Sequence, residues 1–390
     1  MKKIISGLSV LLFAVIFSTS ANAAPGDLFV QIDLEDGPGD TTQCSILKIA
    51  PNGTFTEFVS FTDIIALTGD DNCEMDDEAI AVADNGDVYF SEDESDSIIM
   101  ATPAGALSTF VSEAQITAVT GSGNADIDNG MVIGPDGDLY FADANSDSIL
   151  KATIPGGVVS LVLSEAQIIA VTGNTEANLN GGIAFDCSGN LYISDDANNE
   201  ESDQKSILVL SPAGFLSVFV SEQEIVAATG FDNIDLDSGM TFFDSLFVND
   251  DGNCDCVLRI TLGGAVSVFV SEDQITAVTG NDDADVDGGN AVNQMREVFI
   301  GDDGSLPDDS NVLMSNPNGS SLSIVVSNQQ LEDFYPAFGN PRLQGNMAFE
   351  GVEACQISQI PTLSEWGLIA MAGVLGIIGL LAVRRRKAAI

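Results

Sequence analysis

Acidic and amide side chains recur at alternate positions ahead of small turn residues in this chain. The clearest copies are Asp283-x-Asp285-x-Asp287-Gly288, Asn124-x-Asp126-x-Asp128 and Asn233-x-Asp235-x-Asp237. Carboxylate and amide oxygens are the ligands that hard cations such as Ca²⁺ prefer, and alternate spacing lets several of them fold round one ion. These nine side chains are therefore candidate calcium ligands.

Weaker copies of the pattern complete a series. They are Glu176-x-Asn178-x-Asn180-Gly181, Asn72-x-Glu74-x-Asp76 and, without acids, Asn340-x-Arg342-x-Gln344-Gly345. The bidentate Glu that an EF-hand carries six residues after its glycine is missing, so an EF-hand proper is excluded. If calcium binds, we expect an affinity on the order of 10⁻⁴ to 10⁻³ M, as in extracellular modules. The alternative is that these oxygens bind nothing and cap their own turns through backbone N–H groups.

The pattern of acids does not indicate an enzyme. The sequence contains no histidine, which removes the commonest general base, the usual Ser/His and Cys/His pairs, and histidine-ligated zinc. Cys254-Asp255-Cys256 has neither the spacing nor the histidine of a zinc site, and it is too short for a comfortable mutual disulfide. The six cysteines still predict some disulfides if the chain is exported.

A repeat of roughly 50 residues positions these acids. A Phe-Val-Ser-Glu-like sequence recurs, and its serines are separated by 52, 52, 57, 50 and 56 residues. These serines are Ser60, Ser112, Ser164, Ser221, Ser271 and Ser327. Each is followed three residues later by Gln or an acid, which predicts a capping box and a short helix.

Within one repeat, short apolar runs alternate with turn residues. Residues 131–133, 138–141, 148–152 and 158–163 read as four strands, separated by Pro-Asp-Gly, an acidic loop and Pro-Gly-Gly. In such a meander the loop after the second strand and the connection into the next first strand emerge on the same face. The loops after the second strands are acidic as well: Glu92-Asp93-Glu94, Asp143, Asp195-Asp196, Asp250-Asp251 and Asp302-Asp303. One face should therefore be strongly negative.

The two ends of the repeat region indicate a closed ring. The first unit begins with a second strand at residues 27–30, and the missing first strand appears after the last unit, at residues 346–350. We therefore predict an all-β fold, a six-bladed β-propeller of four-stranded antiparallel blades with short helical inserts between blades. Seven blades, or another all-β repeat fold, are the alternatives. The stretch Gly-Asp-Leu-Tyr-Phe-Ala-Asp at 137–143 and its copies also resemble NHL-type and gluconolactonase-like propellers over residues 27–351.

Both termini are typical of addressing segments. Lys2 and Lys3, an apolar stretch and Ala21-Asn22-Ala23 predict a signal peptide over residues 1–23. The propeller is expected over 24–356, and residues 357–390 contain an apolar helix at about 368–383, long enough to cross a membrane, followed by four basic residues. Immediately before this helix stand Ile360, Pro361, Thr362, Leu363, Trp366 and Gly367.

This C-terminal arrangement resembles the IPTL-CTERM sorting signal of Gram-negative bacteria. The resemblance implies a sorting peptidase of the exosortase type, an inner-membrane anchor through the C-terminal helix, and delivery to the cell surface or the medium. A permanent single-span anchor is the alternative.

The charge narrows the choice of partners. The chain has 390 residues, 59 acidic and 12 basic, with a net charge of −47, which excludes nucleic acid and favours cations or basic partners. We predict an exported binding or structural module with an acidic, calcium-binding face and an unknown surface or matrix partner. The alternatives are a metal-dependent extracytoplasmic hydrolase or lactonase of the gluconolactonase-like type, and a matrix component whose charge binds only water and salt.

Overall fold

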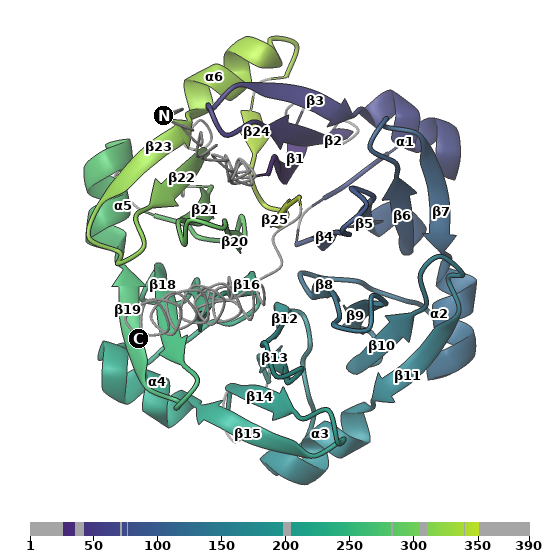
Figure 1. Ribbon diagram of the computed structural model, residues 1–390, viewed down its shortest axis with the longest axis vertical. Coiled ribbons are helices and arrows are strands. Elements are labelled where there is room, and N and C mark those ends of the chain that lie inside the picture. Colours follow the sequence, from purple (N-terminus) through teal and green to yellow (C-terminus); the bar gives the residue numbers. More distant parts are fainter. Residues whose placement is uncertain are drawn as a thin grey trace, which may run out of the picture.

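Six antiparallel sheets stand radially around one axis in the computed structural model of the protein (Figure 1). The structure describes residues 26–35, 43–70, 72–75, 77–197, 204–281, 284–303, 310–338 and 340–350. The innermost strands contact one another in a closed circle, so the predicted six-bladed propeller is confirmed.

The blades are numbered in chain order, and each has four strands from the axis outward, with one additional short strand in blade 1. The innermost strands are β25 (Met347–Phe349), β4 (Ile80–Val82), β8 (Met131–Ile133), β12 (Ile183–Phe185), β16 (Met240–Phe242) and β20 (Asn290–Val292). The second strands are β1 (Leu28–Glu35), β5 (Val88–Glu92), β9 (Leu139–Asp143), β13 (Leu191–Asp195), β17 (Ser245–Asp250) and β21 (Val298–Asp302). The third strands are β2 (Gln43–Ile49), β6 (Ser97–Ala101), β10 (Ser148–Ala152), β14 (Ser206–Leu210), β18 (Cys256–Thr261) and β22 (Asn311–Ser315). The outermost strands are β3 (Phe55–Val59), β7 (Leu107–Val111), β11 (Val159–Leu163), β15 (Leu216–Ser221), β19 (Val266–Val270) and β23 (Leu322–Val326).

The ring closes by pairing the two ends of the propeller. In blade 1, β25 pairs antiparallel with β1, with Leu28 opposite Phe349 and Val30 opposite Met347. This is the strand that the sequence predicted after the last unit. A further short strand that was not predicted, β24 (Asn340–Arg342), pairs with the other end of β1. The backbone N–H of Glu350 donates to the carbonyl of Asp27 at 2.9 Å, so both described chain ends lie at the same edge of blade 1.

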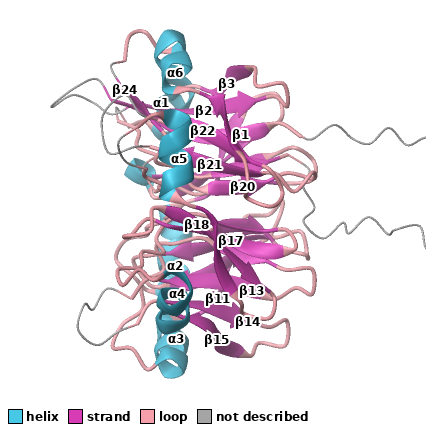
Figure 2. Cartoon of the chain, turned by 90° about the vertical axis from the view of Figure 1, so that its left-hand side faces the viewer, coloured by secondary structure: helices cyan, strands magenta, loops and turns pink. Residues whose placement is uncertain are grey.

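A helix follows each outermost strand. The helices are α1 (Phe61–Thr68), α2 (Glu113–Thr120), α3 (Glu165–Thr172), α4 (Glu222–Thr229), α5 (Glu272–Thr279) and α6 (Asn328–Phe334). The predicted capping boxes are present in α2 to α6, and Ser60 accepts from the N–H of Asp63 at the start of α1. Helices α1 to α5 each pack against the outermost strand of the next blade. They form a row around the rim, which Figure 2 shows from the side.

Glycines allow the backbones to meet near the axis. A Cβ atom on Gly182 would overlap the backbone nitrogen of Met240 in the next blade, and one on Gly181 would overlap the carbonyl of Leu236. Side-chain-bearing residues at these positions would therefore push neighbouring blades apart.

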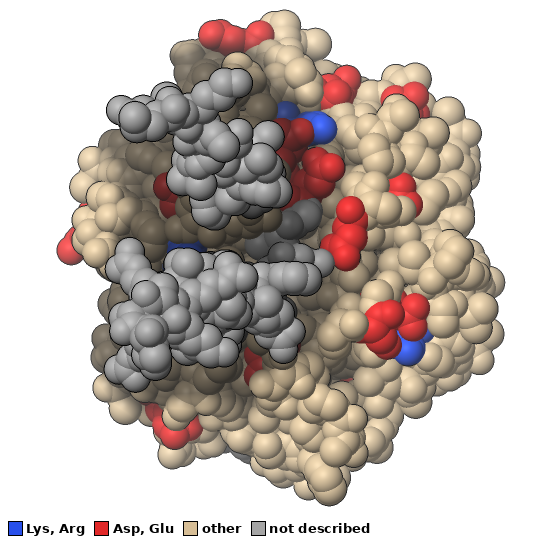
Figure 3. Space-filling view, viewed as in Figure 1, with Lys and Arg blue, Asp and Glu red and all other residues tan. Residues whose placement is uncertain are grey.

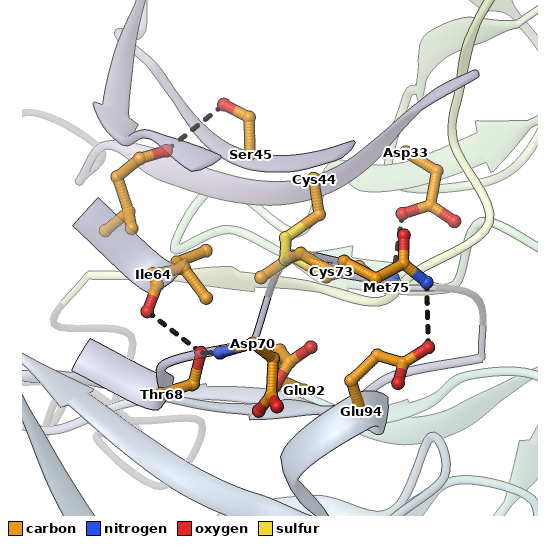
Figure 4. Close-up of a disulfide and its surroundings, with 12 residues drawn as sticks. Asp33, Cys44, Ser45, Ile64, Thr68, Asp70, Cys73, Met75, Glu92 and Glu94 are labelled. Atoms are coloured by element: carbon orange, nitrogen blue, oxygen red, sulfur yellow. Dashed lines mark hydrogen bonds between the residues drawn. A yellow bond between two sulfur atoms is a disulfide. The ribbon is translucent and has the colours of Figure 1, made fainter. Parts of the chain in front are cut away.

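Two disulfides are present in the described residues. Cys44 and Cys73 join β2 to the connection into blade 2 (Figure 4). Cys254 and Cys256 are bonded to each other, so the prediction that this pair is too close to bridge was wrong. Asp255 between them has a φ of 39°, and this left-handed turn brings the two Cα atoms to 5.1 Å, an ordinary separation for a disulfide.

The predicted signal peptide, the sorting motif from Ile360 to Gly367 and the apolar segment at 368–383 lie outside the described residues. Within the described part of the chain, no helix is both long and apolar enough to span a bilayer.

Candidate cation-binding face

The acids at the ends of the second strands hold the connections that carry the alternating motif. In four blades, one carboxylate oxygen of the strand-end Asp accepts the backbone N–H of the middle motif residue at 2.9 to 3.2 Å. The pairs are Asp143 with Asp126, Asp195 with Asn178, Asp250 with Asp235, and Asp302 with Asp285. The structure therefore brings both groups of acids to the same side of the disc, here called the junction face.

A second set of hydrogen bonds crosses from one blade to the next. In blades 4 and 6 the acid after the end of the second strand, and in blade 1 the equivalent Asp33 within β1, accepts the N–H of a buried apolar residue in the next connection. Asp33 accepts from Met75 at 2.7 Å (Figure 4), Asp196 from Leu236 at 3.0 Å, and Asp303 from Leu343 at 3.1 Å. One oxygen of each of these acids therefore satisfies a backbone donor in the neighbouring connection and helps to hold adjacent blades together.

Basic side chains neutralise two of the junctions. Lys205 Nζ lies 2.7 Å from Asp196 Oδ1 and 3.1 Å from Asp235 Oδ1, which links blade 4 to the connection into blade 5. At the junction between blades 6 and 1, Arg342 Nη2 lies 2.9 Å from Asp303 Oδ2. Asp235, a predicted calcium ligand, is therefore already engaged by an ammonium group.

The junction between blades 5 and 6 gathers acids without a basic partner in the described residues. Asp237, Asp251 and Asp287 each place a carboxylate oxygen within 4.8 Å of the other two. Burial raises the pKa of Asp251 and of Asp287, and each is raised further by the charge of Asp285. One oxygen of Asp237 is buried and has no hydrogen-bond partner among the described residues. Carboxylates so close together raise one another's pKa, and a cation between them would favour their charged forms.

The junction between blades 2 and 3 has a second group. Asp93, Asp96 and Asp126 also place oxygens within 4.8 Å of one another. Burial, followed by the charges of Glu113 and Asp126, raises the pKa of Asp96 to about 7. Burial and the neighbouring Asp126 raise the pKa of Asp128 as well.

The structure distributes the nine predicted ligands unevenly. Asp126, Asp237 and Asp287 belong to the two groups, whereas Asp283 lies outside the described residues. The backbone N–H of Asn124 donates a hydrogen bond to Ser122 Oγ within the same turn at 3.4 Å. The backbone carbonyl of Asn233 accepts from the N–H of Asn253. The two groups also contain Asp93, Asp96 and Asp251, which were not among the nine predicted residues. For Asp93 and Asp251 the available signal was their place in the acidic loops after second strands.

A third arrangement of acid and sulfur is not a metal site. Asp250 lies beside Cys254 and Cys256, but the two sulfurs are joined to each other and cannot act as thiolate ligands.

The face of the disc opposite the junction face has a central cavity with largely apolar walls. A cavity of about 480 Å³ opens around the axis, walled by apolar residues of the innermost strands such as Met131 and Phe242, with Asn129 and Asn346 among its lining residues. The turns between first and second strands, including Asp84 and Asp186, lie at its mouth. In the visible part of this face, acids lie in separate small groups (Figure 3). The acids of the chain are therefore not confined to the junction face, although the alternating motifs are.

Comparisons with known proteins support two features. Residues 359–386 match the IPTL-CTERM motif, which indicates an exported, surface-sorted protein. The chain is similar in structure to a chain in a nidogen/laminin complex, with a TM-score of 0.51 and 14% identity, covering 82% of this chain and 97% of that one. It also aligns with a gluconolactonase from Xanthomonas campestris, with a TM-score of 0.46 and 13% identity over 68% and 82% of the two chains. At these identities the likeness shows the propeller fold alone. No curated protein sequence matches the chain.

Proposed function

We propose that this protein is a surface-delivered propeller whose junction face binds calcium and, loaded with it, serves as a binding or structural module. The observation that carries the proposal is the convergence of Asp237, Asp251 and Asp287 within 4.8 Å, with a buried Asp237 oxygen that lacks a partner. Carboxylates in this number suit Ca²⁺, which takes six to eight oxygen ligands in flexible geometry.

The orientation of the disc supports a role for this face at the surface. The first and last described residues, Gly26 and Glu350, lie on the face opposite the junction face. Strand β1 begins near them at Leu28 and ends on the junction face at Glu35. A propeller held by its C-terminal segment would present the junction face away from its anchor. Processing of that segment by an exosortase-type peptidase, with a transient inner-membrane anchor, is the route that the IPTL-CTERM motif supports.

Calcium titration of the purified full-length protein in detergent tests the proposal. We expect saturable Ca²⁺ binding by isothermal titration calorimetry and a melting temperature that rises with calcium and falls with EDTA. Asp287→Asn should weaken binding, because it removes one charged ligand from the group of three. Asp84→Asn, on the opposite face, is the matched control and should bind as the native chain does. Equal melting temperatures in EDTA and in millimolar calcium would contradict the proposal.

A further inference from the structure

The six junctions can be compared at one equivalent pair of positions. In blades 2 to 6 the first position is the residue after the end of the second strand, and in blade 1 it is Asp33, the equivalent residue by register within β1. The other position is the middle residue of the alternating motif in the next connection. In order around the ring the pairs are Asp33/Glu74, Asp93/Asp126, Ala144/Asn178, Asp196/Asp235, Asp251/Asp285 and Asp303/Arg342.

At three of the six junctions, the two positions do not carry two uncompensated acids, for a different reason in each case. In the fourth pair, Lys205 places its ammonium between the two carboxylates at 2.7 and 3.1 Å. In the sixth pair, an arginine replaces one acid and contacts the other at 2.9 Å. The third pair carries no charge.

The pairs Asp93/Asp126 and Asp251/Asp285, at the junctions between blades 2 and 3 and between blades 5 and 6, have an acid at both positions, and no ion pair with a lysine or arginine is found for them among the described residues. The first pair, Asp33/Glu74, also consists of two acids; its junction contains the Cys44–Cys73 disulfide, and Asp33 accepts the N–H of Met75. The carboxylate of Glu74 groups with Asp93 and Glu94 instead.

A buried carboxyl group beside the junction of blades 2 and 3 independently favours a cation there. Glu78 is only 2% exposed, and its Oε2 has no hydrogen-bond partner among the described residues. Glu78 forms a β-bridge with Asp128, and the charges of Asp128 and Asp93 act on it. The Glu78 carboxyl group has a side-chain hydrogen bond with Ser91 but no basic partner among the described residues, and a buried carboxylate close to further acids is unfavourable unless a proton or a metal ion compensates its charge.

We infer that Lys205 acts as an internal counter-ion at the junction of blades 4 and 5. Its ammonium group takes the position there that a divalent cation takes at the junction of blades 2 and 3. This inference rests on the proposed calcium binding and specifies which junctions take part. The cation site between blades 2 and 3 comprises Asp93, Asp96 and Asp126, with Glu78 as the buried acid behind them.

Removing the lysine should therefore create a binding site. We would count bound calcium per chain by equilibrium dialysis for the native protein, Lys205→Met and Lys48→Met. Lys48 pairs with the single Asp27 at 2.6 Å on the opposite edge and is the matched control. Lys205→Met should bind one more Ca²⁺ than the native protein, because Asp196 and Asp235 would then need an external cation; Lys48→Met should bind the native number.

Glu78→Gln tests the other half of the inference and remains informative if Lys205→Met folds poorly. We expect it to bind one Ca²⁺ fewer than the native chain, with an unchanged fold by circular dichroism. The native number of ions in either Lys205→Met or Glu78→Gln would overturn the inference while leaving calcium binding itself intact. If the native chain binds no calcium at all, the proposed function fails first, so the two failures are distinguishable.

Discussion

The side-chain amide of Asn129 donates a hydrogen bond to the backbone carbonyl of Asp237 at 2.6 Å, from blade 3 to blade 5. The amide of Asn346, which follows the last motif copy and precedes β25, donates in turn to the carbonyl of Asn129 at 2.9 Å. Blades 1, 3 and 5 are therefore connected to one another near the axis by two asparagine side chains. Both asparagines are buried, so these bonds are not exchanged freely with water.

Asn129→Ala should weaken the ring. It removes the amide that reaches Asp237 and leaves a buried carbonyl without this donor, which costs about 1 to 3 kcal/mol of unfolding free energy. Denaturant unfolding followed by circular dichroism measures the change. Asn52→Ala is the control, since Asn52 accepts only from Thr54 in its own exposed turn. A loss at Asn129 no larger than that at Asn52 would mean that the connection across the axis contributes little.

The capping residue of α5 has a second role that can be separated from capping. Gln274 completes the capping box with Ser271, and its Nε2 also donates to the carbonyl of Gly319 in blade 6 at 2.8 Å. In α4 the equivalent residue is Glu224, which forms the same box without an amide donor. Gln274→Glu should therefore keep the helix but lose the bond between blades, lowering the unfolding free energy by about 1 kcal/mol.

The control for this substitution adds the same charge in the first turn of a helix. Gln223→Glu lies on the exposed side of α4 and should leave stability within about 0.5 kcal/mol of native. An equal effect of the two substitutions would assign the loss to charge and not to the missing hydrogen bond.

Ring closure depends on the last described strand. A chain ending at Gln344 lacks β25, so Leu28 to Val30 in β1 lose their inner partner and present an open edge. We expect its melting temperature to fall by roughly 10 °C or more relative to a chain ending at Glu350, which keeps the strand. Thermal unfolding of the two chains makes the comparison directly. Equal melting temperatures would show that the remaining strand β24 is sufficient to close blade 1.

The fold could be predicted in unusual detail because each repeat contains clear turn residues and a helix-capping serine that mark where its elements begin and end. The spacing of Ser112 and Ser164, the apolar runs between turn residues and the displaced first strand fix the number and order of strands before any packing is considered. The capping boxes follow from the serine and the residue three positions on, which is a purely local rule. The bridge between Cys254 and Cys256 was missed because it depends on the left-handed conformation of Asp255, which the spacing of the cysteines does not reveal.

The site was less predictable, because alternate spacing does not determine which oxygens remain available. Asp235 and Asp237 belong to the same motif, yet Lys205 engages only the first, and Lys205 lies 30 residues away in the chain. Asp251 comes from a loop after a second strand and meets Asp287 only through the ring geometry. Glu78 has no motif at all. Whether an acid binds a cation, a lysine or a backbone N–H is decided by contacts between blades.

Asp147 allows the effect of burial on an acid to be measured away from the proposed ligands. Burial raises its pKa from 3.8 to about 7, with Glu165 and Asp195 adding repulsion, although its Oδ1 accepts the N–H of Leu179 at 3.1 Å. The folded state therefore binds more protons than the unfolded state between about pH 4 and pH 7, so the stability from this group is present at low pH and is lost as pH rises through 7.

Asp147→Asn removes that loss and keeps an oxygen for Leu179. We expect the variant to exceed the native protein in unfolding free energy by about 1 to 2 kcal/mol at pH 8, after allowance for solvent screening of a partly exposed group, and by much less at pH 4. Asp147 has a φ of 45°, which asparagine tolerates well. Any gain in stability from the preference of asparagine for this φ is independent of pH. Only the difference between the stability gains at pH 4 and at pH 8 therefore reports the effect of the Asp147 charge. Denaturant unfolding at both pH values provides the measurement, and a gain of the same size at pH 4 and pH 8 would rule out the titration of Asp147 as its cause.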